Sequence, residues 1–280
     1  MANKHYRLTL GQDFRGRCLP LHGLGSQIRA AAALMQVAAL RGDRVHPTIP
    51  ALDGRDLWQE IFDSPPPPPG AIECPCDELE WNPAMEQAHH PAASDHIQFR
   101  ADFRERLDYV WKMEGECRVG LSLRETDKLD GGECPLPPSI IAETLCDVHE
   151  PFLVFSDTTI YLTALFTHFP DSQVFLHTRG HRSHSIFPLH VPRGASPLMT
   201  GESLAEHTIE IFEDMYLMSK LERIYYPVWH GVLSIAKLLN PAIDLVCCRR
   251  SLNLRDAELI RFYMDRELAL WKRLDHQHGG

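Results

Sequence analysis

The stretch Arg118-Val-Gly-Leu-Ser-Leu-Arg-Glu-Thr-Asp-Lys128 decides the fold class of this chain, because an apolar run leads directly into charged and hydroxyl side chains. The residues before Arg124 have the pattern of a buried strand, and Arg124–Lys128 falls where that strand should end in a loop. Open α/β sheets bind ligands at the carboxyl ends of their strands, and a guanidinium there suits a phosphate. The alternative is a surface loop with a local Arg–Asp ion pair.

The residues around this stretch alternate between expected strands and expected helices. Strands are expected at 117–123, 152–156, 173–177, 223–228 and 243–248, and helices at 139–148, 158–169, 203–219 and 229–239. Such alternation predicts a mostly parallel sheet with right-handed crossovers. The five strands therefore predict one Rossmann-like domain.

The N-terminal third predicts a second, less regular domain. A short strand is expected at Cys18–His22, followed by the glycine turn Gly23-Leu-Gly25-Ser26-Gln27. An Ala-rich helix is expected over 28–40 with Ser26 as its N-cap. The next strand is expected at Val45–Ile49. The remaining expectations are a stiff surface connection at Pro65–Pro69, long loops over 70–98, and a helix from the spacing of Phe99, Phe103, Leu107, Val110 and Trp111.

Three parts are therefore expected. Residues 1–113 would form an N-terminal Rossmann-like domain, and residues 114–250 a C-terminal Rossmann-like domain. Residues 251–280 predict an amphipathic helix, which would dock back on the chain or form a homodimer contact.

Composition excludes several classes of protein. The formal net charge of −10 over 280 residues argues against a nucleic-acid surface. The most apolar window, Phe152–Phe166, is too polar to span a membrane, and no apolar segment follows Met1–Arg7 as in a secretory signal. The eight cysteines include no CxxC pair. We therefore expect a cytoplasmic protein with reduced thiols.

The histidine-rich segment 177–190 has two interpretations. Its histidines could bind a metal ion only if the loop folded back on itself. A solvated loop at the carboxyl edge of the sheet, able to close over phosphates, is the favoured interpretation, and no metal site is proposed. Cys74-Pro-Cys76 is interpreted as a loop rather than a redox pair.

Several motifs in the right order carry a resemblance to a known family. They are Ser122-Leu-Arg-Glu-Thr-Asp-Lys128, Leu153-Val-Phe-Ser-Asp-Thr158 with His168-Phe-Pro170, and Glu213–Glu222 with Tyr225–Gly231, preceded by Gly23–Gln27. Together they resemble the superfamily of α-1,6-fucosyltransferases, nodulation fucosyltransferases and protein O-fucosyltransferases. The resemblance implies a GT-B architecture, in which two Rossmann-like α/β domains face each other across a cleft. Residues 1–113 would then lie on the acceptor side, and residues 114–250 would bind the nucleotide sugar. It also implies inverting transfer from GDP-fucose without a metal or other cofactor, the GDP-sugar being the donor substrate.

The resemblance also implies roles for individual residues. Arg124 would hold the donor phosphates, and Lys128 would lie close to the reacting groups. Glu133 is the candidate base if one residue has been inserted after Lys128, and Glu125 competes for that role. Asp157 would lie near the guanine. The complete set of substrate-binding candidates is Gly23, Gly25, Ser122, Thr126, Asp157, Thr158, Trp229 and His230.

Some positions depart from the family pattern. Ser122 replaces a histidine, Glu125 replaces a second arginine, and Trp229-His230-Gly231 replaces Ser-Ser-Gln. The chain is therefore expected to transfer fucose or a related sugar to a hydroxyl of a glycan or small molecule. The alternative is a catalytically silent GT-B protein that binds a nucleotide or a protein partner, and an epimerase or hydrolase is a third interpretation.

Overall fold

The protein forms two compact units, described here from a computed structural model. The structure describes residues 4–10, 24–51, 53–74, 91–113, 115–123, 136, 138–156, 168–169, 174–176, 201–227 and 229–248. Unit 1 comprises 1–110, 201–219 and 230–242, and unit 2 comprises 111–200, 220–229 and 243–280. Two helices that the sequence analysis assigned to the C-terminal domain, α8 (Gly201–Ser219) and α9 (Gly231–Leu239), therefore belong to unit 1.

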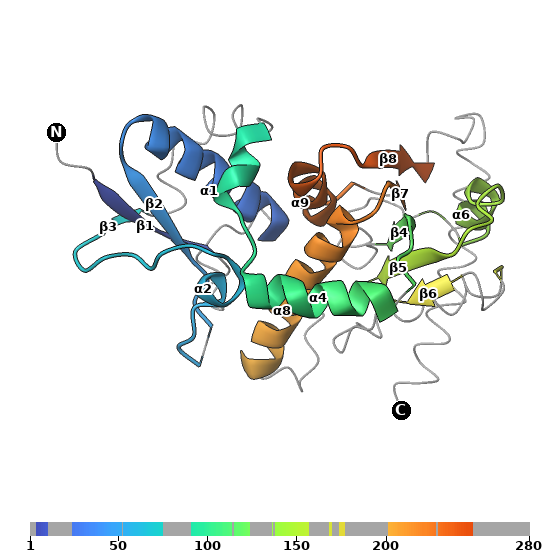
Figure 1. Ribbon diagram of the computed structural model, residues 1–280, viewed down its shortest axis with the longest axis horizontal. Coiled ribbons are helices and arrows are strands. Elements are labelled where there is room, and N and C mark those ends of the chain that lie inside the picture. The colour runs from blue at the N-terminus through green and yellow to red at the C-terminus, as the bar shows by residue number, and fades with distance from the viewer. Residues whose placement is uncertain are drawn as a thin grey trace. The chain divides into compact units, whose positions relative to one another are not determined.

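Unit 2 contains a five-stranded parallel sheet in the order β6-β5-β4-β7-β8 (Figure 1). The strands are β4 (Val119–Leu123), β5 (Phe152–Ser156), β6 (Val174–Leu176), β7 (Arg223–Tyr226) and β8 (Asp244–Cys247). All neighbouring pairs run parallel. The Rossmann-like sheet expected from the sequence is confirmed.

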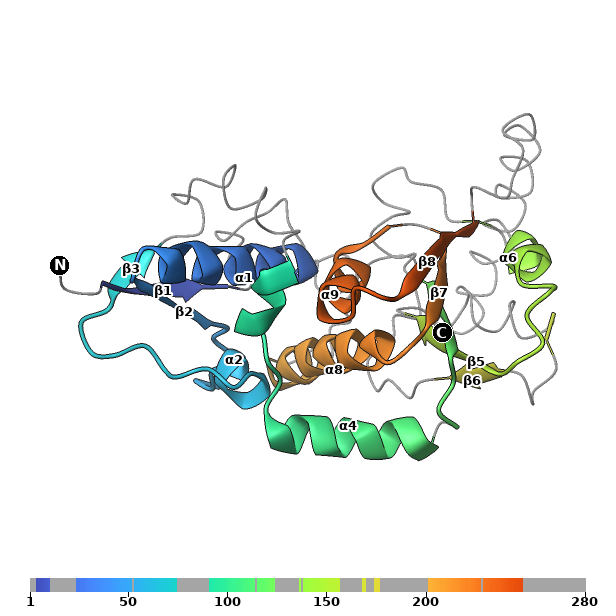
Figure 2. The ribbon, with the colours of Figure 1, turned by 45° about the horizontal axis from the view of Figure 1, so that its top comes forward.

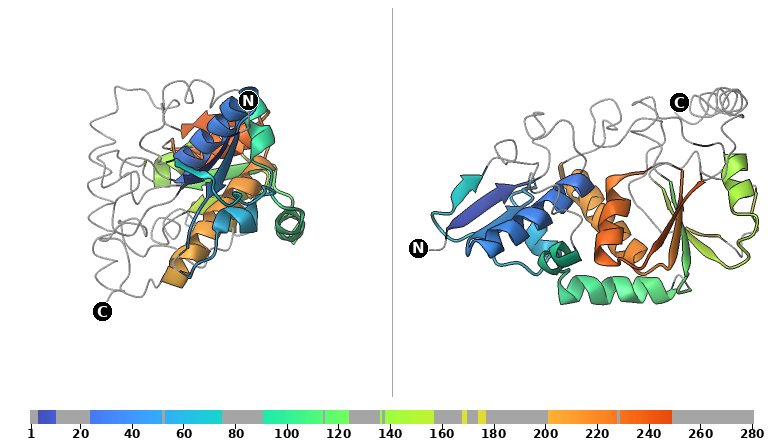
Figure 3. Two further views of the ribbon diagram at one scale, coloured as in Figure 1. Left: turned by 90° about the vertical axis from the view of Figure 1, so that its left-hand side faces the viewer. Right: turned by 90° about the horizontal axis from the view of Figure 1, so that it is seen from above.

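The core of unit 2 lies around the two central strands. All five residues of β4 and all five of β5 are buried, which is why both read as continuous apolar runs rather than alternating ones. Helix α6 (Pro138–Thr144) covers the sheet through Ile141, which packs in the same cluster as Val119, Phe152 and Val154 (Figure 3). This buried centre fixes the carboxyl ends of the strands.

Unit 1 contains a three-stranded parallel sheet in the order β2-β1-β3. Its strands are β1 (His5–Thr9), β2 (Arg44–Thr48) and β3 (Ile72–Cys74). Helix α1 (Leu24–Leu40) runs alongside this sheet (Figure 2). The unit also includes α2 (Leu57–Ile61), the 3-10 helix η1 (Pro91–His96) and most of α4 (Ala101–Met113), together with α8 and α9.

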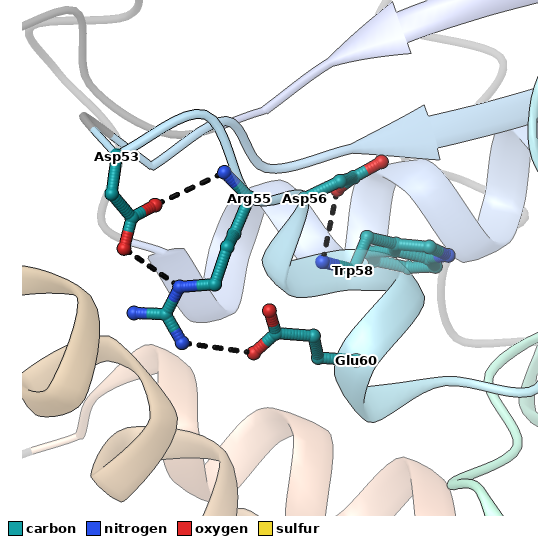
Figure 4. Close-up of polar contacts among 5 residues, drawn as sticks. All are labelled: Asp53, Arg55, Asp56, Trp58 and Glu60. Atoms are coloured by element: carbon teal, nitrogen blue, oxygen red, sulfur yellow. Dashed lines mark hydrogen bonds and ion pairs between the residues drawn. The ribbon is translucent and has the colours of Figure 1, made fainter.

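A polar network fixes the turn between β2 and α2 (Figure 4). Asp56 is the N-cap of α2, and its Oδ1 accepts hydrogen bonds from the amides of Ile49 at 2.8 Å and Trp58 at 3.1 Å. The Arg55 guanidinium donates hydrogen bonds from Nε to Asp53 Oδ2 at 2.7 Å and from Nη1 to Glu60 Oε2 at 3.3 Å. These contacts place Trp58 in the core at the start of the helix.

An aromatic cluster joins the helices of unit 1. Trp58 and Phe62 of the α2 region contact each other at 4.3 Å between ring centroids, and Phe62 meets Phe212 of α8 edge-on at 5.3 Å. Phe99, just before α4, packs edge-on against Tyr216 at 5.3 Å. Two polar contacts between α4 and α8 reinforce the cluster: Arg106 to Glu213 at 2.6 Å and Tyr216 to Asp108 at 2.8 Å.

Several local expectations need correction or lie outside the described residues. Helix α1 begins at Leu24, so Ser26 lies inside it and is not its N-cap. Strand β1 was not expected, and β3 and η1 lie in a region interpreted as loops. The whole of the expected strand 18–22, most of the expected helix 158–169 and the whole amphipathic helix beyond 250 fall outside the described residues. Within the described part of the chain, no helix is long and apolar enough to cross a membrane.

Candidate functional site

The two central strands of unit 2 end level with each other. Leu123, the last residue of β4, pairs with Ser156, the last residue of β5. The next residues along the chain are Arg124 and Asp157, two of the site candidates, which lie outside the described residues. Arg124 therefore comes directly after Leu123 in the chain and Asp157 directly after Ser156, and these two preceding residues are paired at the carboxyl edge of the sheet.

The order of the strands reverses beside β4. From β4 the chain adds β5 and β6 on one side, and then β7 and β8 on the other. β4 and β7 are neighbours, with Leu121 paired to Tyr225. Open α/β sheets bind their ligands at such a switch point, outside the carboxyl ends of the strands. The switch point of unit 2 therefore lies where β4 leads into Arg124 and β7 leads into Trp229.

The segment that leaves β7 presents one exposed and one buried ring. Trp229 is 47% exposed, whereas His230 is 7% exposed. His230 is the N-cap of α9, in an extended conformation with φ −147° and ψ 165°, and its side chain makes no capping hydrogen bond. The first amides of a helix have no intrahelical acceptor and attract anions, phosphates above all. The start of α9 therefore has the chemistry to receive a phosphate.

In unit 1, helix α1 approaches the start of α9 very closely. The gap is so small that a Cβ placed on Gly25 would come within 2.4 Å of the carbonyl carbon of Gly231. Arg29 lies one turn further along α1, four residues after Gly25, and so on the same helix face. Partial burial lowers the pKa of the Arg29 guanidinium, and its buried Nε has no hydrogen-bond partner among the described residues. The sequence analysis did not select Arg29 as a site candidate. The signal in the sequence was its position four residues after Gly25, on the same face of the expected helix.

The structure places four of the predicted site residues. Gly25 is buried in the first turn of α1, and Ser122 is 1% exposed within β4. Trp229 and His230 connect β7 to α9. The other candidates lie outside the described residues: Gly23, Arg124, Thr126, Lys128, Glu133, Asp157 and Thr158, together with the competing Glu125.

The segments considered as metal or redox sites are described only in part. The histidine-rich segment 177–190 and Cys76 lie outside the described residues. Among the residues that are described, no three His, Cys, Asp or Glu side chains gather as metal ligands would. Within the described part of the chain, no disulfide joins Cys117, Cys146, Cys247 or Cys248.

Comparison with known proteins identifies the fold. No protein-family model matches the sequence, and no curated protein matches it. The structure resembles the α-1,6-fucosyltransferase NodZ soaked with GDP-fucose, with a TM-score of 0.53 at 14% identity over 86% of this chain and 94% of that one. NodZ from Bradyrhizobium gives 0.53 at 13% identity over the same shares. POFUT1 in complex with GDP gives 0.51 at 7% identity over 88% of this chain and 98% of that one. At these identities the likeness concerns the fold, and the chain has the GT-B fold of these fucosyltransferases.

Proposed function

We propose that this protein is an inverting, metal-independent glycosyltransferase that transfers fucose or a related sugar from a GDP-sugar to a hydroxyl of a glycan or small molecule. The observation that carries the proposal is the paired end of β4 and β5 at the switch point, from which Arg124 and Asp157 follow. The fold supports the proposal, because its neighbour NodZ was soaked with GDP-fucose and its neighbour POFUT1 was solved in complex with GDP.

Binding of the donor rests on the neutralisation of its diphosphate. Arg124 would hold the phosphates through paired, charge-assisted hydrogen bonds, and Lys128 would add a second positive charge. Asp157 would accept hydrogen bonds from the guanine. Together these groups would serve in place of a metal ion, so activity should persist in the presence of a chelator.

The reaction follows from this arrangement. The bond between the anomeric carbon and the β-phosphate oxygen breaks, and its electron pair leaves with GDP, where Arg124 and Lys128 stabilise it. The acceptor oxygen attacks the opposite face of the anomeric carbon, and its proton passes to a carboxylate. Glu133 is the proposed base. The product therefore has the inverted anomeric configuration.

Arg124→Ala tests the proposal directly. A lost contact between a guanidinium and a phosphate should lower the affinity for GDP at least tenfold. Binding of GDP to wild type and variant can be measured by calorimetry, with circular dichroism as the control for folding. Unchanged affinity in a folded Arg124→Ala protein would refute the role of Arg124. Failure of the wild type to bind GDP or any GDP-sugar would refute the function.

A catalytically silent GT-B protein is the second candidate. The specific observation in its favour is the set of replaced motif positions, Ser122, Glu125 and Trp229–Gly231. Ser122 is moreover buried within β4. Tight binding of GDP without transfer to any acceptor, and without hydrolysis of GDP-fucose, would favour this second function.

A further inference from the structure

Two histidine rings of unit 1 are joined by a hydrogen bond. His5 Nδ1 lies 3.0 Å from His46 Nε2, and the planes of the two rings differ by 18°. His46 is 4% exposed, whereas His5 is half-buried. On its other side the His46 ring bonds the carbonyl oxygen of Pro65, with 3.1 Å between Nδ1 and that oxygen. The two rings and the carbonyl therefore form one chain, which connects β1, β2 and the start of the proline run.

The carbonyl at the end of this chain determines which ring nitrogens carry hydrogen. A carbonyl oxygen can only accept, so Nδ1 of His46 must be a donor. In the neutral ring, Nε2 of His46 is then the acceptor, and the hydrogen between the rings belongs to Nδ1 of His5. Nε2 of His5 is thus the ring nitrogen whose lone pair these two bonds leave available.

The pair can bind one proton without breaking, but not two. The first proton adds to Nε2 of His5, and both hydrogen bonds remain. A second proton would have to add to Nε2 of His46, which already accepts the hydrogen of His5. Two N–H groups on two positively charged rings would then face each other where the nitrogens are now 3.0 Å apart. The His5 ring must therefore move away before the second proton binds, so the two protonation steps are coupled.

The charges on the same face of the sheet oppose the second proton. Residues in register on the neighbouring strands β1 and β2 point to the same face, and successive residues alternate between faces (Figure 2). His5 is paired with Arg44, and Arg7 is paired with His46, so two arginines share the face of the two histidines. Glu73 of β3 lies on this face as well, but its carboxylate accepts a hydrogen bond from Arg7 at 2.8 Å.

The other parts of unit 1 around these strands supply no counter-charge to the pair. Within the described part of the chain, neither histidine forms an ion pair with a carboxylate. The remaining ionisable side chains of α1, of α2 and of the residues that flank β1, β2 and the proline run are Lys4, Arg29, Asp43, Glu60 and Asp63. Asp43 accepts a hydrogen bond from the backbone amide of Lys4, and Glu60 accepts one from Arg55.

We propose that His5 and His46 form an acid-sensitive link between β1 and β2. Free histidine side chains bind a proton below a pH of about 6.5. In the unfolded chain both rings bind protons there, whereas the folded pair binds only one. Because the unfolded state then binds more protons, stability falls as the pH falls. A difference of one proton raises the unfolding constant about tenfold for each pH unit, so acid weakens the attachment of β1 to β2.

The experiment measures the unfolding constant by urea titration at several values between about pH 7.5 and about pH 4.5. His5→Gln is the test variant. Its amide can turn and offer either NH2 or oxygen to His46, so a proton on His46 is tolerated and the link no longer responds to acid. His149→Gln is the matched control, because His149 is an exposed histidine of unit 2.

In the acidic part of this range, the unfolding constant of wild type should rise about tenfold more per pH unit than that of His5→Gln. His149→Gln should follow wild type. The same pH dependence in wild type and His5→Gln would overturn the proposal. An equal change in His149→Gln would overturn it too, since removal of any histidine would then have this effect.

A second measurement uses the wild-type protein alone. NMR of histidines labelled with nitrogen-15 shows which ring nitrogen carries the hydrogen, and the coupling across the N–H···N bond identifies the pair. In mildly alkaline solution both His5 and His46 should be in the form with hydrogen on Nδ1. A His46 ring with its hydrogen on Nε2 would contradict the bond to Pro65 and would overturn the proposal.

Discussion

Gly25 in the first turn of α1 and Gly231 in the first turn of α9 are in direct backbone contact. A Cβ on Gly25 would lie 2.4 Å from the carbonyl carbon and 2.6 Å from the carbonyl oxygen of Gly231. Backbone atoms cannot turn aside as the end of a side chain can. The absence of a side chain at Gly25 is therefore what allows the two helices to approach each other.

Gly25→Ala should destabilise the protein, although alanine is the better helix former. Helix propensity alone would favour alanine by about 1 kcal/mol in a helix interior, whereas overpacking of a tight contact costs about 1–3 kcal/mol. The net effect should be a lower free energy of unfolding, which denaturant titration measures. A gain in stability would mean that α1 and α9 can separate without cost.

Gly120→Ala in β4 is the matched control for this prediction. A Cβ there would also be crowded, at 2.5 Å, but by the Cδ1 atom at the end of the Leu221 side chain. Because this side chain can adopt another rotamer, the loss of stability should be smaller than in Gly25→Ala. Equal losses in the two variants would show that backbone contact is not the reason for the glycine at position 25.

The sheet of unit 2 could be predicted from the sequence because its central strands carry an unambiguous signal. β5 is a run of five buried residues, and the expected and observed bounds, 152–156, are the same. β4 and β8 were expected within two residues of their observed ends, and α8 began two residues earlier than expected. Long apolar runs between turn residues leave little choice of structure.

The less regular parts of unit 1 could not be predicted, since tertiary contacts decide them. Strand β1 mixes polar and apolar residues and is half-exposed, and β3 has three residues. Gly23-Leu-Gly25 was interpreted as a turn, yet Gly25 lies in the first turn of α1, close to the backbone of Gly231 in α9. A helix was likewise expected at 203–219, but the sequence could not indicate that this helix, α8, packs against the aromatic rings of Phe62 and Phe99. At the candidate site, the chain position of Arg124 at a strand end was predictable, whereas the level pairing of β4 and β5 needed the structure.

Trp58→Phe should cost little stability, whereas Phe212→Ala should cost much. The buried indole nitrogen of Trp58 has no hydrogen-bond partner within the described part of the chain, so the substitution removes a donor that contributes nothing there. Removal of this unpaired donor offsets part of the stability that is lost with the smaller ring. The free energy of unfolding should therefore fall by less than about 1.5 kcal/mol. Phe212→Ala removes a ring in contact with Phe62 and should cost about 3–5 kcal/mol. Denaturant titration measures both, and a large loss in Trp58→Phe would reveal a partner for the indole.

Cys248 should resist alkylation in the folded protein. Burial raises the pKa of its thiol from the ordinary 9.0 to about 12, so the reactive thiolate is scarce at pH 8. Exposed Cys146 is the internal control and should react with iodoacetamide first, as mass spectrometry of each site can show. Because unfolding restores the ordinary pKa, the contribution of Cys248 to stability is full below pH 9.0 and is lost as the pH rises towards about 12. The Cys248→Ala variant should lack this part of the alkaline loss, and rapid labelling of Cys248 at pH 8 would contradict its burial.

Glu133→Gln should separate donor binding from catalysis. An inverting transfer needs a group that removes the proton of the acceptor hydroxyl while positive charge develops at the anomeric carbon. Glu133 follows the Arg124–Lys128 segment after Gly131-Gly132, a step that would allow its carboxylate to turn towards the acceptor. A glutamine has nearly the same shape but cannot take the proton, so turnover should fall about 10²-fold or more while GDP affinity stays within twofold.

The matched variant for this test is Glu125→Gln. In the resemblance to fucosyltransferases, Glu125 replaces a second arginine, and an ion pair with Arg124 or Lys128 is its alternative role. If Glu125 forms such an ion pair, Glu125→Gln should alter GDP affinity and leave the pH dependence of turnover unchanged. Glu133→Gln, in contrast, should abolish the rise of turnover with pH on the acidic side, which deprotonation of the base causes. Full turnover in Glu133→Gln, combined with loss of turnover in Glu125→Gln at unchanged GDP affinity, would assign proton removal to Glu125.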